Sequence, residues 1–210
     1  MSKFHDVRCV KPVCFGNVLS RQLHHFSDAS QVGYGAVTYL RLTDEDGRVH
    51  CSLIIAKSRL VPLKTVSIPR LELSAANISV KLDTMMRKEL EVPIDASYFW
   101  TDSTTVLKYV KNEDKRFHTF EANRVALVRD GSDPSQWKHV DTKVNPADDA
   151  SRGLRAQDLL HSTCWLSGPT FLIQPEVEWP NSEVELDIPE GDPEVKKTIV
   201  KSCAAVVEEK

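Results

Sequence analysis

Four carboxylates stand at the ends of predicted structural elements, where a folded chain can bring them together. Asp28 and Asp102 each end an apolar run with strand character. Glu72 lies near the predicted start of a long helix, and Asp148 opens the last predicted helix. Because open α/β sheets place their sites at the carboxyl ends of strands, these junctions are where a functional group of acids is expected.

Converging carboxylates repel one another, so a site that collects them needs cations. Hard oxygen ligands with room for water are what Mg²⁺ prefers. Two such ions about 4 Å apart can activate a water and stabilise the leaving oxygen in phosphodiester cleavage. Taken alone, Asp102 is better explained as a helix cap than as a metal ligand, and Glu72 is equally well explained as a first-turn carboxylate favoured by the helix dipole. Finding four such acids favours a metal site, and the capping role then falls to Ser103 or to no residue.

The composition is that of an ordinary globular protein. The net charge of −3 gives no overall basic excess that would announce nucleic-acid binding, so basic character has to be judged by region. The five cysteines form no CxxC pair, and with no secretory signal at the N-terminus they are interpreted as reduced intracellular thiols. Cys9, Cys14, His24 and His25 match no zinc-site spacing. No apolar run approaches the roughly 20 residues of a membrane span.

The order of predicted elements is β-β-β-α-β-α-α-β-α, one mixed α/β domain. The Asp46-Gly47 pair predicts a tight hairpin between the second and third strands. We assign residues 1–20 to an irregular lead-in, 21–165 to the domain and 166–210 to a proline-rich acidic linker or tail. The elements are expected at strands 23–28, 33–42, 49–56, 96–101 and 136–140, and at helices 69–90, 103–111, 117–129 and from 146 toward 160.

Basic residues gather around the approach to Glu72. Lys57, Arg59, Lys64 and Arg70 could contact phosphates there and position a duplex without reading its sequence. A second set on the two middle helices is interpreted as ordinary solvated helix faces: Lys108, Lys111, Lys115, Arg116, Arg124 and Arg129.

Several stretches carry a family resemblance. With the element order above, Asp28-Ala29-Ser30, Arg70-Leu71-Glu72-Leu73 and Thr101-Asp102-Ser103 resemble the ribonuclease H fold and its Asp-Glu-Asp-Asp active site. More narrowly, the chain resembles the ribonuclease H region of BEL/Pao-type LTR retrotransposon polyproteins, also labelled a Pao retrotransposon peptidase family region, over about residues 8–180. The stretches that carry this narrower resemblance are 23–30, 56–59, 68–73, 137–140, 145–153 and 165–172, with Trp179-Pro180.

The resemblance implies a ribonuclease H-like fold with a five-stranded mixed sheet, a three-strand antiparallel meander plus two further strands, flanked by helices. It also implies a metal-dependent endonuclease that hydrolyses the RNA strand of RNA/DNA hybrids with two Mg²⁺ ions, or Mn²⁺. Asp28 would be shared by both metals, Glu72 and Asp102 would hold the second, and Asp148 would complete the first, with Asp149 as its substitute. The loop before Asp148 lacks the histidine of the family's best-known enzymes. His139 is interpreted as a strand residue.

The resemblance also implies partners and a location. These are an RNA/DNA hybrid, the reverse transcriptase and integrase parts of the same polyprotein, no membrane, and an intracellular particle in the cytoplasm or the nucleus. An aspartic peptidase is disfavoured because neither Asp28 nor Asp102 is followed by the Ser/Thr-Gly of that dyad. An integrase would end its triad on Glu, and a proofreading exonuclease would have Glu where Ser30 stands. The remaining alternative is a catalytically silent ribonuclease H-fold interaction module.

Overall fold

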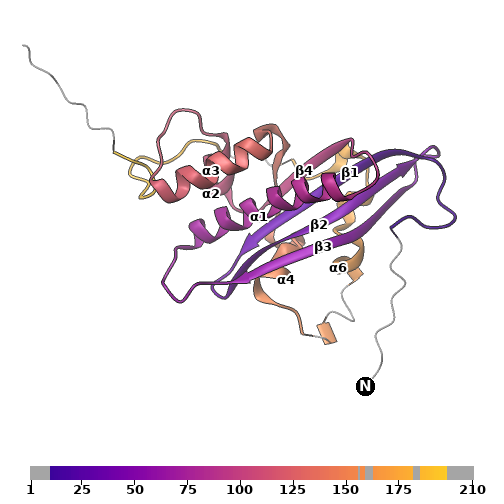
Figure 1. Ribbon diagram of the computed structural model, residues 1–210, viewed down its shortest axis with the longest axis horizontal. Coiled ribbons are helices and arrows are strands. Elements are labelled where there is room, and N and C mark those ends of the chain that lie inside the picture. The colour runs from indigo at the N-terminus through magenta and orange to yellow at the C-terminus, as the bar shows by residue number, and fades with distance from the viewer. Residues whose placement is uncertain (1–9, 156, 159–162, 182–184, 198–210) are drawn as a thin grey trace, which may run out of the picture.

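The structure is a computed structural model that describes residues 10–155, 157–158, 163–181 and 185–197. Its centre is a five-stranded sheet in the order β3-β2-β1-β4-β5 (Figure 1). Strands β1 (Val18–Ala29), β2 (Gly33–Asp44) and β3 (Val49–Leu60) form an antiparallel meander. Strands β4 (Ala96–Thr101) and β5 (Trp137–His139) continue it in parallel with β1. The predicted mixed sheet, with its meander and two further strands, is confirmed.

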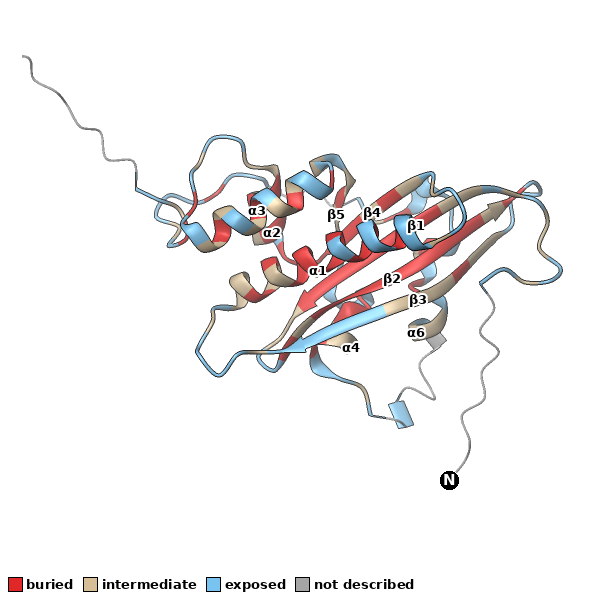
Figure 2. Ribbon diagram, in the orientation of Figure 1, coloured by how far each residue is buried: buried red, intermediate tan, exposed pale blue. Residues whose placement is uncertain are grey.

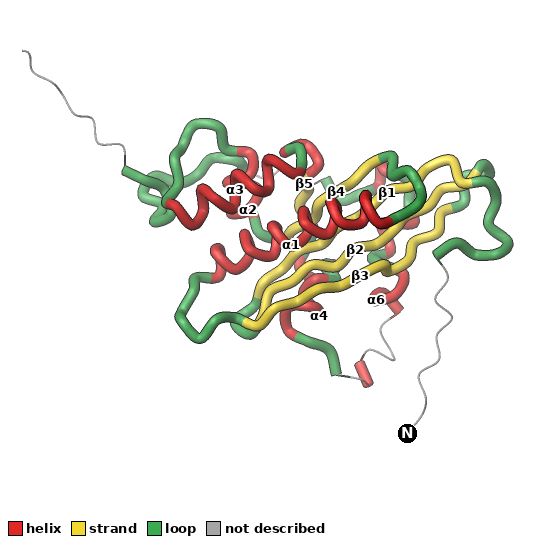
Figure 3. The backbone as a smooth tube through the Cα atoms, viewed as in Figure 1, coloured by secondary structure: helices red, strands yellow, loops and turns green. Residues whose placement is uncertain are grey.

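Helices cover both faces of this sheet (Figures 1 and 3). The long helix α1 (Ile68–Glu89) packs on β1 and β2, and α2 (Thr104–Lys111) and α3 (Thr119–Gly131) pack beside it. The short helices α4 (Ala147–Arg152) and α6 (Thr163–Ser167) contact β2 and β3, respectively. In the part of the chain that the structure describes, no helix has both the length and the apolar character needed to cross a bilayer.

The core lies in two layers on either side of the sheet. On the α1 side, Leu73 and Val80 pack with apolar residues of α2 and α3, while Ile78 and Leu82 face the sheet. On the other side, Trp100 and other side chains of the sheet pack with Ala147 of α4. Figure 2 shows that the central strands are buried and that the C-terminal part of β3 is exposed. The alternation of side chains along each strand explains this division, because successive residues point to opposite faces.

Several element boundaries differ from the expected ones, among them β1, which begins at Val18 instead of residue 23, and two of the differences bear on the site. Strand β3 continues to Leu60 instead of ending at residue 56, so Lys57 and Arg59 stand on an exposed edge strand rather than in a connection. The last predicted helix ends at Arg152, where Gly153 takes a φ of 83° and donates its N–H to the Asp149 carbonyl. Glycine adopts this left-handed conformation without steric cost, which makes it a common helix terminator. Residues 156 and 159–162 of the expected helix lie outside the described residues.

The segment after residue 165, expected to be a linker or tail, packs on the domain over much of its described part. Leu172 and Trp179 are buried in the core layer that contains Trp100. Farther along, Ile188 is buried against α2 and α3, and Val195 pairs with Phe117 as an isolated β-bridge. The spacing of the prolines predicted a linker, but prolines also occur in ordered extended segments that form no helix or strand, so the sequence did not indicate these contacts.

Candidate active site

Asp28 and Asp102 lie next to each other at one end of the sheet. Ser27 of β1 and Thr101 of β4 are register partners in a parallel pair, so the two aspartates follow that pair directly. Neighbouring strands are about 4.8 Å apart, which brings the two backbones close at their carboxyl ends. Asp28 is buried, and Asp102 is partly exposed. The expectation that two strand-end acids share one edge is met by this register.

Glu72 reaches the same region from α1. The helix begins at Ile68, so Glu72 lies beyond its first turn, which contains no acid. The alternative explanation by the helix dipole is therefore weakened, since that effect falls off within the first turn. The Ser103 hydroxyl donates to Glu72 Oε2 at 2.5 Å and accepts from the Val106 N–H at 3.2 Å. Ser103 thus caps α2, as predicted, and also holds Glu72.

Asp148 enters from the opposite face of the sheet on α4. The Ser151 hydroxyl, one turn later, donates to Asp28 Oδ2 and also lies 3.1 Å from the Asp148 carbonyl oxygen. Arg152 Nε donates to Asp148 Oδ1 at 2.7 Å. Gly33 makes this approach of α4 possible, because a Cβ there would stand 2.7 Å from the Ser151 carbonyl oxygen.

Asp102 is anchored by the loop before α4. The Thr142 hydroxyl donates to Asp102 Oδ2 at 2.7 Å. The amide of Asn145 donates to Asp102 Oδ1 at 3.3 Å and to the Ser27 carbonyl at 3.2 Å. Asn145 therefore connects the ends of β1 and β4 to the start of α4.

The carboxylates sense one another electrostatically. Burial raises the pKa of Asp28, the Ser151 hydrogen bond opposes the rise, and the charges of Asp102 and Asp148 add to it. Burial likewise raises the pKa of Glu72, with Ser103 opposing the rise and Asp102 and Asp28 adding to it. The charges that raise the pKa of these two acids come from neighbouring aspartates. Arg152 pairs with Asp148, but among the described residues no ion pair to Asp28 or Glu72 is formed, so a cation would relieve the repulsion between them.

The donor set suits a hard divalent cation in its chemistry. Carboxylate oxygens are the ligands that Mg²⁺ prefers. Among the described residues, however, no three acidic, histidine or cysteine side chains surround a common point closely enough to hold an ion as they stand. The three hydroxyls of Ser103, Thr142 and Ser151 occupy carboxylate oxygens instead.

Asp149, the substitute for Asp148, faces other groups. Burial raises the pKa of Asp149, and Asp148 and Asp158 add to the rise, while Asp28, Glu72 and Asp102 are absent from the charges that act on it. Asp148, by contrast, acts directly on Asp28. Of the two neighbours, Asp148 is the one that the fold couples to the other acids.

His139 lies in β5, as expected, and pairs with Thr101 next to the site. Its Nδ1 is buried and has no hydrogen-bond partner within the described residues. The sequence gives no signal for that unpaired nitrogen, because it depends on which side chains pack around the strand end.

The four predicted phosphate contacts separate into different environments. Lys57 and Arg59 are exposed on β3, and Lys64 is exposed in the connection to α1. Arg70 is instead neutralised: its guanidinium lies 2.8 Å from Glu121 and 2.7 Å from Glu194. Glu194 belongs to the segment that sequence reasoning placed in a free tail, so this pairing could not be foreseen.

Sequence reasoning did not assign a site role to Thr142, Asn145 or Ser151. All three lie in or beside the stretch 145–153 that carries part of the family resemblance. A usable signal was the spacing of Ser151 three residues after Asp148, since side chains three apart on a helix share a face.

The first half of the chain is similar to a known protein family. Residues 5–103 match the family described as the Pao retrotransposon-like RNaseH-like domain, a range that includes Asp28, Glu72 and Asp102 and stops before Asp148. No curated protein matches the chain. Similar solved structures include RNase H1 from Halobacterium salinarum NRC-1, at 13% identity over 62% of this chain and 92% of that one, with a TM-score of 0.40. LC11-RNase H1 in complex with an RNA/DNA hybrid is similar at 14% identity over 67% and 99%, with a TM-score of 0.42.

The family match and the strand order agree with the expectation drawn from the sequence motifs. The matched range covers the antiparallel meander, α1 and the end of β4, which together position three of the four acids. The fold is ribonuclease H-like, and residues 5–103 of this chain are similar to the Pao retrotransposon-like RNaseH-like domain family.

Proposed function

We propose that this domain is a metal-dependent endonuclease that hydrolyses the RNA strand of RNA/DNA hybrids. The observation that carries the proposal is geometric: the parallel register of β1 and β4 sets Asp28 beside Asp102, and hydroxyl groups of Ser103 and Ser151 connect Glu72 and α4 to the same end of the sheet. A structural role alone would not place four acids from four elements around one strand end with no cation compensating Asp28 or Glu72. Buried like charges of this kind mark functional sites more often than structural ones.

The residues divide into ligands and supports. Asp28 would be shared by two ions, Glu72 and Asp102 would hold one of them, and Asp148 would complete the other. Bound Mg²⁺ or Mn²⁺ would supply an activated water and stabilise the charge on the leaving oxygen. Ser103, Thr142 and Ser151 keep the carboxylates oriented from the outside, as partners beyond the ligands do in other metal sites.

The hybrid and the wider context belong to the same proposal. A ribonuclease H must recognise RNA by its 2′-hydroxyl and groove shape, and Lys57, Arg59 and Lys64 are exposed for phosphate contacts. The domain would act as part of a retrotransposon polyprotein, alongside reverse transcriptase and integrase, in an intracellular particle or the nucleus. The second candidate is a catalytically silent interaction module with the same fold.

The test is cleavage of an end-labelled RNA/DNA hybrid in Mg²⁺ or Mn²⁺. We expect Asp102→Asn to lower the rate by at least about 100-fold, because even partners beyond the ligands contribute 10- to 100-fold at metal sites. Asp130→Asn is the matched control, since Asp130 is exposed on α3 and away from the acids. Equal rates for the two variants would refute the assigned site, and no cleavage with either metal would favour the silent module.

Metal binding gives a readout that needs no turnover. Ligands that bind only the folded state stabilise it by RT ln(1 + [L]/Kd), about 1.4 kcal/mol at tenfold excess over Kd. Mg²⁺ should therefore raise the melting temperature of the unaltered chain and of Asp130→Asn, and Asp102→Asn should lose most of the rise. Comparing Asp148→Asn with Asp149→Asn in the same assay decides which of the two completes the site.

A further inference from the structure

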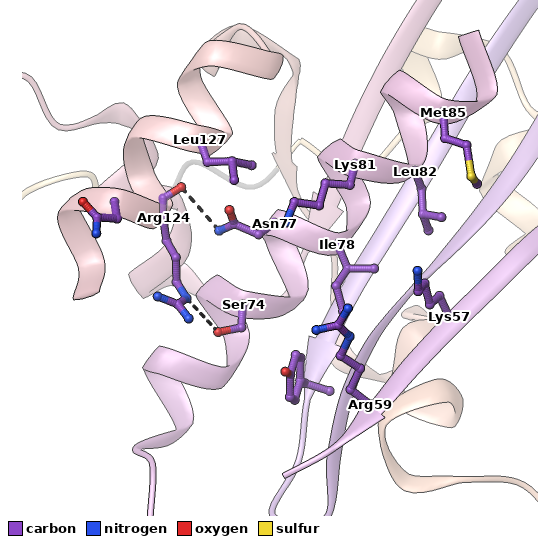
Figure 4. Close-up of a pocket in the computed structure, with 12 residues that line it drawn as sticks. Lys57, Arg59, Ser74, Asn77, Ile78, Lys81, Leu82, Met85, Arg124 and Leu127 are labelled. Carbon is purple, nitrogen blue, oxygen red and sulfur yellow. Dashed lines mark hydrogen bonds between the residues drawn. The ribbon is translucent and has the colours of Figure 1, made fainter. Parts of the chain in front are cut away.

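A basic cleft lies on the outer side of α1, between α3 and the edge strand β3 (Figure 4). Its volume is about 440 Å³. Four cationic side chains from three elements line it: Lys57 and Arg59 from β3, Lys81 from α1 and Arg124 from α3. No acidic side chain lines it within the described residues. In a chain with three more acidic than basic residues, such a one-sided concentration of positive charge is a distinct feature of this surface.

Three of these four cationic side chains are not neutralised by an acidic partner within the described residues. Within the described residues, Lys57, Arg59 and Lys81 form no ion pair, and all three are exposed. Arg124 is partly engaged: it donates from Nε to Ser74 Oγ at 3.1 Å and from Nη1 to the Phe120 carbonyl at 3.2 Å, and its guanidinium lies 3.4 Å from the centre of the Phe120 ring. The contrast is Arg70, whose charge two glutamates already neutralise.

The α3 wall of the cleft is fixed to its floor, helix α1. Asn77 Nδ2 donates to the Leu73 carbonyl at 2.8 Å and to the Arg124 carbonyl at 3.3 Å, and Arg124 returns a bond to Ser74 (Figure 4). These contacts connect α1 to α3 across the floor of the cleft. A preformed arrangement of charges loses little entropy when a ligand binds.

We propose that this cleft binds the phosphate backbone of a nucleic-acid strand, as a contact separate from the carboxylate site. The cleft follows α1 from Ser74 to Met85, about 17 Å at 1.5 Å per residue. That length corresponds to about five steps along the axis of a duplex, where the phosphates of each strand recur every 3.4 Å. Exposed lysines and arginines that follow a groove without a carboxylate partner are the electrostatic pattern of sequence-independent phosphate binding.

The inference deepens the proposed function, on which it rests for the identity of the ligand. The floor of the cleft is the helix that also carries Glu72, so a strand held here is joined by one rigid element to the acidic end of the sheet. It also changes the set of phosphate contacts: Lys81 and Arg124 join Lys57 and Arg59, while the neutralised Arg70 leaves it.

The test compares two exposed lysines on the same helix. Lys81→Gln removes a charge that lines the cleft, and Lys88→Gln removes one seven residues later, outside it. Binding of a fluorescent 20-nucleotide single-stranded DNA is measured in EDTA at several salt concentrations. This probe and buffer need no hydrolysis, so the outcome is independent of whether the chain cleaves hybrids.

Each phosphate contact to a single strand contributes about 0.7 to the slope of log K against log salt, which corresponds to about fivefold in affinity at 0.1 M salt. Lys81→Gln should therefore weaken binding about fivefold, and Lys57→Gln combined with Lys81→Gln about 25-fold, with the slope reduced by about 1.4. Lys88→Gln should bind like the unaltered chain. All variants should keep the unaltered melting temperature, because the replaced side chains are exposed.

Two results would overturn the proposal. One is equal affinity and salt slope for Lys81→Gln, Lys88→Gln and the unaltered chain, whether or not the chain cleaves hybrids. The other is displacement of the DNA by poly-glutamate at equal charge concentration as effectively as by unlabelled DNA, which would assign the cleft to an acidic protein segment instead.

Discussion

Gly33→Ala tests how the sheet positions the last helix of the site. An alanine Cβ at residue 33 would stand 2.7 Å from the Ser151 carbonyl oxygen and 3.1 Å from the Arg59 carbonyl oxygen. Ordinary contact begins near 3.4 Å, so the α4 backbone must retreat by about 0.7 Å from β2. The Ser30 hydroxyl now donates to that carbonyl at 2.9 Å, and the same movement would stretch this bond to about 3.6 Å, beyond hydrogen-bonding distance.

The expected loss of stability follows from these contacts. Overpacking typically costs about 1–3 kcal/mol, and replacing glycine with alanine regains about 0.4–1 kcal/mol by restricting the unfolded chain. The net loss is about 1–2 kcal/mol in the free energy of unfolding, or a melting temperature lower by roughly 2–8 °C for a domain of this size. Ser151 and Asp148 move with α4, so the Mg²⁺-dependent rise in melting temperature and the rate of hybrid cleavage should both fall.

Gly47→Ala is the matched control. Gly47 has a φ of 75° and nothing within 4 Å of an added Cβ, so alanine there costs a similar amount through backbone strain alone. It should lower stability without changing metal binding or cleavage well below the melting temperature.

A double-mutant cycle isolates the contact itself, independently of any activity. In the unaltered chain Ser30→Ala removes the hydrogen bond to Ser151, worth about 0.5–1.5 kcal/mol, together with the bonds that the Ser30 hydroxyl accepts from the Val32 and Gly33 N–H groups. In the Gly33→Ala background the bond to Ser151 is already broken, so the same substitution should cost less by about 0.5–1.5 kcal/mol. Additive costs in chemical denaturation would refute the movement of α4 that this reasoning requires.

Two further outcomes are expected. Leu172→Ala should lower the free energy of unfolding by about 2–5 kcal/mol in urea titrations, because Leu172 is buried in the core, and a loss below about 0.5 kcal/mol would mean that the segment after residue 165 is a free tail. Burial lowers the pKa of both His24 and His25 from 6.5, so at a pH below 6.5 these histidines are protonated in the unfolded chain before they are protonated in the folded one. Their contribution to stability should be fully present above pH 6.5 and should fall as the pH drops toward the folded-state pKa values. The fall is at most about 1.4 kcal/mol per pH unit for each histidine. Urea titrations at pH 7.5, 6.5 and 5.5 measure this, and unchanged stability across the series would contradict the burial of the two rings as neutral groups.

The elements that sequence patterns predicted best are those set by local chemistry. Strand β4 runs over Ala96–Thr101 as expected, and the Asp46-Gly47 turn joins β2 to β3. Both depend on side-chain alternation and on the tolerance of Gly47 for a positive φ, which neighbouring residues determine. The family resemblance then supplied the topology, which local patterns do not contain.

The predictions that failed concern contacts between distant parts of the chain. Leu172 is buried in the core layer that contains Trp100, but its surroundings in the sequence have the proline spacing of a linker. Arg70 was expected to be available for phosphate because its partner Glu194 lies 124 residues away, in the segment after residue 165 that was assigned to a linker or tail. The early end of α4 is different, since Gly153 was visible and the helix-ending role of glycine was not weighed.

The candidate site shows the same division between local and distant causes. The four acids could be proposed from the sequence because each one lies near the expected end or start of an element, and the parallel register of β1 with β4 brings Asp28 and Asp102 together. Their hydroxyl partners could not, because Ser151 lies 123 residues from Asp28 and Thr142 lies 40 from Asp102. Metal ligands can be recognised by residue type, whereas the groups that orient them depend on how close α4 comes to the sheet. Gly33 sets that approach, so a residue with no functional group of its own controls the geometry of the acids.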